Sequence, residues 1–220
     1  MKLADIIKSR DVYEGFLENR IHEYPENFDI NQFKELSSYR KKLQYAKEQL
    51  GKPIGSGSSR SVYRVDETKV LKLAKNKKGI AQNRVEIEWG RDRYFGDLLA
   101  NVFEYDEENS FWVEMELAVK AKKSDFKNLW GVDFTNMGLY LKNWHSINNG
   151  GREAFRVEDE ESFIESTEVQ KTVEFMHSTD APAGDFGRIS SWGVVERNGE
   201  NDLVLIDFGL TGEVYNSYYK

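Results

Sequence analysis

The chain of 220 residues has no cysteine, only three prolines and no long apolar run. Without cysteine it has no disulfides, no thiolate metal ligands and no thiol nucleophile. Residues 1–16 carry charges throughout and lack the apolar core of a signal peptide, and no stretch approaches the ~18 uninterrupted apolar residues that span a bilayer. We therefore expect a soluble, cytoplasmic protein with neither an export signal nor a membrane-spanning segment.

The chain also has fewer positive than negative side chains. The 31 lysines and arginines stand against 38 aspartates and glutamates, which leaves a formal net charge of −7. This balance does not attract nucleic-acid backbones or anionic lipid, so we expect neither among the partners. With 39% hydrophobic and 13% aromatic residues, the composition is that of a folded globule.

Residues 1–50 predict a helical extension. A short amphipathic piece surrounds Ile6, Ile7, Phe16 and Leu17 and is followed by a break at Pro25. A second helix is predicted from a cap at Asn31. Its apolar residues recur at spacings of three, four and seven, the pattern of one buried helix face: Phe33, Leu36, Leu43, Ala46 and Leu50.

From residue 51 onward short strands and helices alternate. Residues 61–65 and 69–74 predict a first hairpin, residues 80–99 a helix, and residues 102–105 and 111–117 a second hairpin. Helices are predicted near 134–145 and 169–177. A last hairpin pairs 192–196 with 203–207 around Asn198-Gly199, a dipeptide that favours tight turns. This order indicates an α+β fold.

The first motif with chemical meaning is a glycine-rich loop over residues 55–62. Gly55 and Gly57 lie where a chain that turns between strands can bring backbone N–H groups close to an anion without an intervening side chain. The loop therefore predicts a phosphate cradle. An ordinary turn is the alternative.

Lys72 follows in the middle of an apolar strand. On a pleated strand its side chain points away from those of Leu71 and Leu73, so it can enter a cleft and meet phosphate oxygens. The alternative is a solvated lysine on an edge strand. Glu86, on the next helix, is our first choice for its partner, because Glu88 is rotated by roughly 200° from Glu86 on the same helix.

Asp207 ends the last apolar strand and precedes Phe208-Gly209. A carboxylate in this position can hold magnesium against phosphate oxygens, since that ion prefers one or two carboxylates together with the nucleotide itself. A turn-forming aspartate is the alternative.

In this order the four elements resemble those of the protein-kinase family, which has a glycine loop, a strand lysine, a helix glutamate and an Asp-Phe-Gly triplet. The resemblance covers roughly residues 54–209. It implies a minimal bilobal protein-kinase-like fold with an antiparallel N-lobe over residues 51–118 and a reduced, mostly helical C-lobe over residues 119–220. It also implies ATP and Mg²⁺ as cofactors, with Lys72 and Glu86 as catalytic residues and Asp207 as a metal ligand.

The same resemblance implies a nucleotide-binding set. Gly55, Gly57 and Lys72 would hold the phosphates, and Ser56 and Val62 would also contact the nucleotide. Met115 would line the adenine pocket, and the backbone from Glu116 to Ala118 would meet the base.

Three departures from the family pattern concern the machinery of transfer. Arg60 replaces the third glycine of the loop, where it either caps the phosphates or obstructs them. The His-Arg-Asp signature is missing, so Asp185 is the candidate base, with Asp180 as the alternative. Ser190 or Ser191 stands where the family has a metal-binding asparagine. We take Ser191 as the candidate ligand, and this exchange puts a second magnesium in question.

The chain ends eleven residues after Gly209 (220 − 209 = 11), which predicts that it has no activation segment of the usual kind. In its short length the chain resembles small kinase-like proteins encoded by bacteriophages. That resemblance implies the host-cell cytoplasm or the virion as the location and a host or virion protein as a partner. Two functions follow: an ATP- and Mg²⁺-dependent phosphotransferase, or a pseudokinase that binds nucleotide without efficient transfer.

Overall fold

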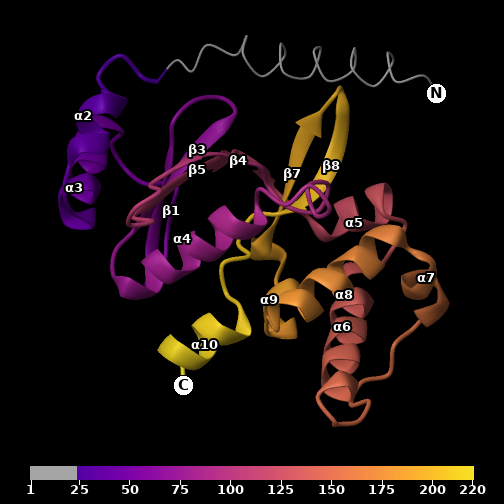
Figure 1. Ribbon diagram of the computed structural model, residues 1–220. Helices are drawn as coiled ribbons and strands as arrows, with labels where there is room; N and C mark the ends of the chain where they lie inside the picture. The colour runs from indigo at the N-terminus through magenta and orange to yellow at the C-terminus, as the bar shows by residue number, and fades with distance from the viewer. Residues whose placement is uncertain (1–23) are drawn as a thin grey trace, which may run out of the picture.

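The computed structural model describes residues 24–220, which form two lobes of an α+β protein (Figure 1). The predicted amphipathic piece around Ile6, Ile7, Phe16 and Leu17 lies outside the described residues. No helix formed by residues 24–220 is both long and apolar enough to cross a bilayer.

The N-terminal lobe is built on a five-stranded antiparallel sheet in the order β1-β2-β3-β5-β4. Its strands are β1 (Gly55–Ser56), β2 (Arg60–Arg64), β3 (Lys69–Ala74), β4 (Val102–Tyr105) and β5 (Trp112–Glu116). Both hairpins predicted from the sequence are present, with ends that shift by a residue or two. The glycine-rich loop is the turn between β1 and β2.

The central strand β3 is buried along its whole length. Leu71 and Leu73 pack with Phe33 and Trp112 in a cluster that the N-terminal helices complete. Lys72, between the two leucines, takes the opposite face of the sheet because side chains alternate along a strand. This alternation directs Lys72 toward α4 (Lys77–Trp89), the helix that covers that face.

Within residues 24–220, two helices rather than one precede the sheet: α2 (Ile30–Glu35) and α3 (Tyr39–Gln49). The prediction of a single helix capped by Asn31 was wrong. Asp29 caps α2, because its carboxylate accepts from the Asn31 N–H at 2.8 Å, and the Ser38 hydroxyl caps α3. The buried Lys42 ammonium donates to the carbonyl oxygen of Phe33 at 2.7 Å and to that of Lys34, so it satisfies backbone groups at the end of α2.

The helix predicted over residues 80–99 is shorter and starts earlier, as α4. It ends at Gly90, where a Cβ atom would lie 2.5 Å from Val102 Cγ2 and 2.7 Å from the Glu86 carbonyl oxygen. After this glycine the chain turns and buries Phe95, Leu98 and Leu99. The Leu205 N–H donates to the Leu98 carbonyl at 2.8 Å, which ties this segment to the C-terminal lobe.

The C-terminal lobe combines a small sheet with helices. The antiparallel sheet has the order β6 (Val119–Lys120), β7 (Trp192–Arg197) and β8 (Glu200–Leu205). Asn198 and Gly199 both have positive φ, at 56° and 83°, as the tight turn predicted for this hairpin requires. The helices are α5 (Lys123–Leu129), α6 (Phe134–Asn148), α7 (Glu160–Glu165), α8 (Thr167–Thr179), α9 (Ala183–Phe186) and α10 (Gly212–Tyr218).

Of these helices, the sequence predicted α6 and α8. Trp192 of β7 is fully buried, its ring packs against those of Phe126 and Trp130, and its indole N–H donates to the Phe186 carbonyl at 2.8 Å. This contact fixes α9 and the loop that follows it. In Figure 1 the C-terminal helix α10 lies beside α4 of the other lobe, so the end of the chain returns to the N-terminal lobe.

Gly79 lies where the glycine-rich loop packs closely on α4. A Cβ atom at Gly79 would lie 2.2 Å from the Ser59 carbonyl oxygen. Helix propensity alone predicts that alanine stabilises by ~1 kcal/mol. We expect Gly79→Ala instead to lower the free energy of unfolding by about 1–3 kcal/mol, because the backbone must shift.

Urea denaturation measures this change. The matched control is Gly184→Ala in α9, where a Cβ atom would meet nothing within 4 Å. A Gly79→Ala protein at least as stable as the wild type would contradict the close approach of loop and helix.

Candidate functional site

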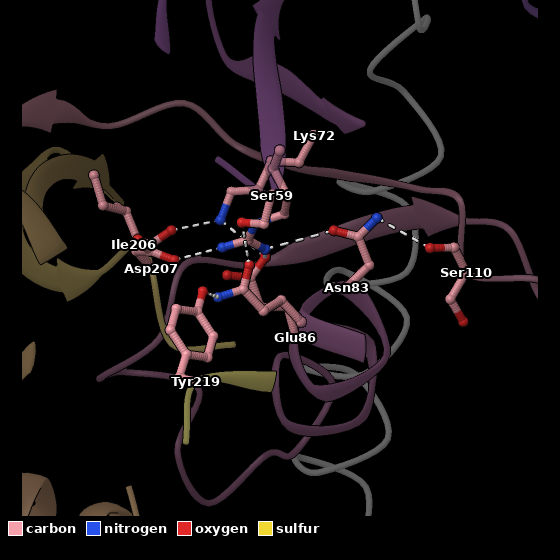
Figure 2. A network of polar contacts seen from close by, with 10 residues as sticks. Ser59, Lys72, Asn83, Glu86, Ser110, Ile206, Asp207 and Tyr219 are labelled. Atoms are coloured by element: carbon pink, nitrogen blue, oxygen red, sulfur yellow. Dashed lines mark hydrogen bonds and ion pairs between the residues drawn. The ribbon is translucent and has the colours of Figure 1, made fainter. Parts of the chain in front are cut away.

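Four charged side chains from both lobes meet beneath the glycine-rich loop (Figure 2): Arg60, Lys72, Glu86 and Asp207. Glu86 is fully buried, and its Oε2 atom accepts from Lys72 Nζ at 2.9 Å and from Arg60 Nη1 at 2.6 Å. Arg60 Nη2 also pairs with Asp207 Oδ1. We call these four residues the charge cluster.

Lys72 makes the contact that the sequence favoured. Its partner is Glu86, whereas Glu88 is exposed. Lys72 Nζ also donates to the Ile206 carbonyl at 2.5 Å, directly before Asp207. Burial lowers the pKa of Lys72 despite the nearby Glu86 carboxylate. Burial by itself would raise the pKa of Glu86, but Arg60 and Lys72 together hold that pKa below its usual value.

Arg60 is the member of the charge cluster whose position the sequence left open. Only 7% of it is exposed, and besides its two carboxylate partners it reaches Asn83 Oδ1 at 3.5 Å. Burial disfavours its charge, but Glu86 and then Asp207 outweigh that effect and raise the pKa of Arg60. Nothing in the spacing of the loop residues indicates where this long side chain points.

Asp207 enters the cluster from the end of β8. Its side chain is 59% exposed, whereas Phe208 is buried against the C-terminal core. A Cβ atom at Gly209 would lie 2.6 Å from the Gln82 carbonyl oxygen of α4. The Asp-Phe-Gly triplet therefore needs its glycine, because α4 packs directly on the backbone at that point.

The glycine-rich loop is a tight hairpin rather than an open cradle. The Gly57 N–H donates to the Arg60 carbonyl at 2.9 Å, and Gly55 pairs with Val62 across β1 and β2. Lys75 Nζ donates to the Gly57 carbonyl at 2.7 Å and to the Ser56 hydroxyl at 2.6 Å. The loop is thus held in place by the segment that joins β3 to α4.

The tail of the chain covers this region. The Gln82 side-chain amide donates to the Tyr219 hydroxyl at 3.3 Å, and Lys78 Nζ lies 3.9 Å from the centroid of the Tyr219 ring. Burial, with the nearby Asp207 carboxylate, raises the pKa of Tyr219. The aromatic residues at the end of the sequence are typical of a segment that packs, but they did not indicate the surface on which it packs.

The segment expected to meet a nucleotide base is largely occupied by internal contacts. Met115 is fully buried, and the Glu116 and Leu117 N–H groups donate to the carbonyls of Asn101 and Thr68, at 2.9 and 2.7 Å. The Glu116 carboxylate accepts from Arg197 at 2.6 Å. Within residues 24–220 the Ala118 N–H has no such partner, so it is the backbone donor of this segment that a ligand can use.

The candidate base Asp185 lies in α9, half-buried, with Arg188 Nη1 at 2.9 Å from its Oδ1. Burial and, more weakly, the charge of Asp207 raise the pKa of Asp185. Asp180, the alternative, is exposed at the end of α8, and its side chain packs against Gly212. Asp185 is therefore the candidate base whose pKa is raised by a residue of the charge cluster, Asp207.

Ser190 and Ser191 differ in exposure. Ser191 is buried, and its carbonyl accepts from the Ile206 N–H at 2.8 Å, one residue before Asp207. Ser190 is exposed. The backbone therefore places Ser191 beside the strand that ends in Asp207.

Magnesium does not fit this arrangement. The one carboxylate that the family pattern assigns to it, on Asp207, is already paired with the Arg60 guanidinium. Among residues 24–220 no group of three or more His, Asp or Glu side chains could hold a metal ion. A hydroxyl such as that of Ser191 adds a neutral ligand, which does not replace a carboxylate for this hard cation.

Two cavities open away from the charge cluster. One of about 570 Å³ lies among α5, α8 and β8, and one of about 260 Å³ lies between α6 and the loop at Gly187 and Ile189. None of the four residues of the charge cluster lines either cavity. The four side chains of the cluster are paired with one another.

A search of protein-family models finds no match, and neither does a search of curated proteins. Among solved structures, the ternary complex of streptomycin, ATP and APH(2")-IIa has a TM-score of 0.34 and 13% identity, covering 79% of this chain and 73% of that one. The gentamicin complex of APH(2")-IIa has a TM-score of 0.33 and 11% identity, with 82% and 74% covered. ADP-bound aminoglycoside phosphotransferase APH(2'')-Ib has a TM-score of 0.32 and 12% identity, with 79% and 72% covered.

Likenesses this distant carry no argument about substrate or reaction. The fold class follows from the strand order and the contacts described above. A five-stranded antiparallel sheet, a helix whose buried glutamate pairs with the central strand's lysine, and a mostly helical second lobe define a bilobal α+β protein.

Glu86 is the negative centre of the charge cluster, and its removal is expected to be costly. Glu86→Gln leaves two buried cations without their shared counter-charge, so we expect the free energy of unfolding at pH 7 to fall by about 3–5 kcal/mol. Because the pKa of Glu86 is lowered in the folded protein, its stabilisation is present above the unfolded value near 4.5 and is lost as the pH falls through the folded value.

Urea denaturation between pH 7 and pH 3 measures both effects. The gap between Glu86→Gln and the wild type should narrow at the acid end. Glu88→Gln, on the same helix but exposed, is the control and should change stability by less than ~0.5 kcal/mol. Equal effects of the two variants would rule out the buried pair.

Proposed function

We propose that this protein binds a nucleoside triphosphate at the charge cluster, where its two lobes meet, and acts as a phosphotransferase of the protein-kinase-like type. The observation that carries the proposal is the buried ion pair of Lys72 with Glu86, at 2.9 Å. A lysine held on the central strand by a buried carboxylate is the arrangement with which this fold class positions a cation for phosphate oxygens.

The binding roles follow the geometry. Lys72 would supply a fixed positive charge, and the glycine-rich loop, with Gly55, Ser56 and Gly57, would contact the phosphates. The base would lie beside Met115 and Glu116, with the Ala118 N–H as its donor. The backbone of Gly193 in β7 lies against the Ala118 side chain, because its missing Cβ leaves room for it.

Asp185 would orient the acceptor hydroxyl. A carboxylate whose pKa is raised by burial is a better general base than an ordinary aspartate, since its basicity is closer to what proton transfer at neutral pH requires. Arg188, at 2.9 Å, fixes the direction of the carboxylate. No step is assigned to magnesium, because Asp207 is paired with Arg60.

The ion pair of Arg60 with Asp207 favours a second function. If Arg60 stays on Asp207 when nucleotide binds and does not replace the cation that normally bridges the phosphates, the protein is a pseudokinase. A bacteriophage origin and a host or virion partner remain predictions from the sequence and enter neither function.

Nucleotide binding is tested by a thermal shift with ATP. A ligand that binds the folded state at 100 times its Kd stabilises by ~2.7 kcal/mol, which corresponds to about 5–10 °C in a chain of this size. We expect this shift for the wild type and its loss in Lys72→Met, which removes the phosphate contact. Lys120→Met, an exposed lysine of β6, is the control and should keep the shift. If millimolar ATP leaves the wild-type Tm unchanged, nucleotide binding is refuted.

Phosphoryl transfer is tested with ATP labelled at the γ-phosphate and a mixture of protein and small-molecule acceptors. For a phosphotransferase we expect Asp185→Asn to reduce transfer by 10²-fold or more, in keeping with the usual contribution of a general base. Asp180→Asn should retain transfer, because its carboxylate packs against Gly212. Binding without any transfer by the wild type would instead favour the pseudokinase.

A further inference from the structure

Arg60 occupies a place in the charge cluster that its position in the sequence does not explain. It comes from β2, at the base of the glycine-rich loop, yet its guanidinium lies between Glu86 of α4 and Asp207 at the end of β8. The side chain is 92% buried. It therefore joins three separate elements and both lobes.

This contact differs from an ordinary surface ion pair. Glu86 has no exposed surface, and its Oε1 atom has no hydrogen-bond partner among the described residues, so its charge is compensated at Oε2 by Arg60 and Lys72 alone. Removing Arg60 from Glu86 would leave half of that compensation. Arg60 is thus anchored at its buried Glu86 end, while its other end pairs with the Asp207 carboxylate, whose side chain is 59% exposed.

The charges of the cluster already balance. Two cations, Arg60 and Lys72, face two carboxylates, Glu86 and Asp207. A divalent cation at Asp207 would add two positive charges next to a guanidinium that stays charged at any physiological pH. Such an ion would have to displace Arg60 or share one exposed carboxylate with it.

We propose that the Arg60 guanidinium takes the place of the divalent cation at Asp207, so that this protein binds the phosphates of a nucleotide through Arg60 and Lys72 without magnesium. The nucleotide part of this inference rests on the proposed function. The exclusion of the metal rests on the charge cluster alone. A guanidinium can serve in this way because it has five N–H donors, and Glu86, Asn83 and Asp207 accept from three of them, which leaves two for phosphate oxygens.

The test compares ATP affinities measured by isothermal titration calorimetry in excess MgCl₂ and in EDTA. For the wild type we expect Kd values that agree within about threefold. Arg60→Met removes the charge but keeps an unbranched chain, so in EDTA it should bind ATP at least tenfold more weakly, about 1.4 kcal/mol. Magnesium should restore most of that loss, because Asp207 is then free for it.

Arg64→Met is the matched control. Arg64 lies on the same strand, is exposed and pairs with Glu67, so its removal should change neither Kd. Arg60→Lys guards against misfolding of the methionine variant, because it keeps the charge near Glu86. A wild-type affinity that rises tenfold or more with magnesium, together with an unchanged Arg60→Met, would overturn the inference while leaving nucleotide binding intact.

Manganese without nucleotide separates the two proposals. Electron paramagnetic resonance should detect no bound Mn²⁺ in the wild type, and a bound ion in Arg60→Met that disappears in the double variant Arg60→Met/Asp207→Asn. If no variant binds ATP, the proposed function fails and this titration alone decides whether Arg60 excludes the metal. A manganese site in the wild type that requires Asp207 would refute that exclusion.

Discussion

One carboxylate oxygen organises the contact between the two lobes. Glu86 Oε2 accepts from Lys72 of β3 and from Arg60 of β2, and these cations in turn reach Ile206 and Asp207 at the end of β8. The sheet, α4 and the second lobe therefore meet at a single buried charge. A buried carboxylate without partners would pay a large desolvation penalty, so the position of α4 depends on both cations being present.

The backbone has to come close for this arrangement to exist. Gly79 lets the loop carbonyl of Ser59 approach α4, and Gly209 lets the Asp-Phe-Gly segment lie on Gln82 of the same helix. At both points a side chain would meet backbone atoms, which cannot rotate away. The buried Ser59 hydroxyl, which donates to the Gln82 side chain at 2.6 Å, connects the two approaches. The glycines thus determine how near the polar side chains can come to one another.

What could be predicted from the sequence depended on local pattern. The hairpins followed from alternation and turn residues, and the preference for Glu86 over Glu88 followed from helix geometry. The end of α4 could not be predicted, because it is set by Val102 of β4 crossing at Gly90, a contact between segments. The positions of the Arg60 and Tyr219 side chains could not be predicted for a similar reason. A long side chain or a terminal aromatic takes its place from tertiary neighbours that spacing along the chain does not encode.

Arg60 also influences the candidate base at a distance. Asp185 and Asp207 repel each other, and this repulsion adds to burial in raising the pKa of Asp185. A guanidinium on Asp207 neutralises that carboxylate, and so limits the repulsion, whereas a bare Asp207 would exert it in full. By pairing with Asp207 while remaining bound to Glu86, Arg60 completes a charge cluster in which two cations face two carboxylates, so the charges of the cluster balance within the protein.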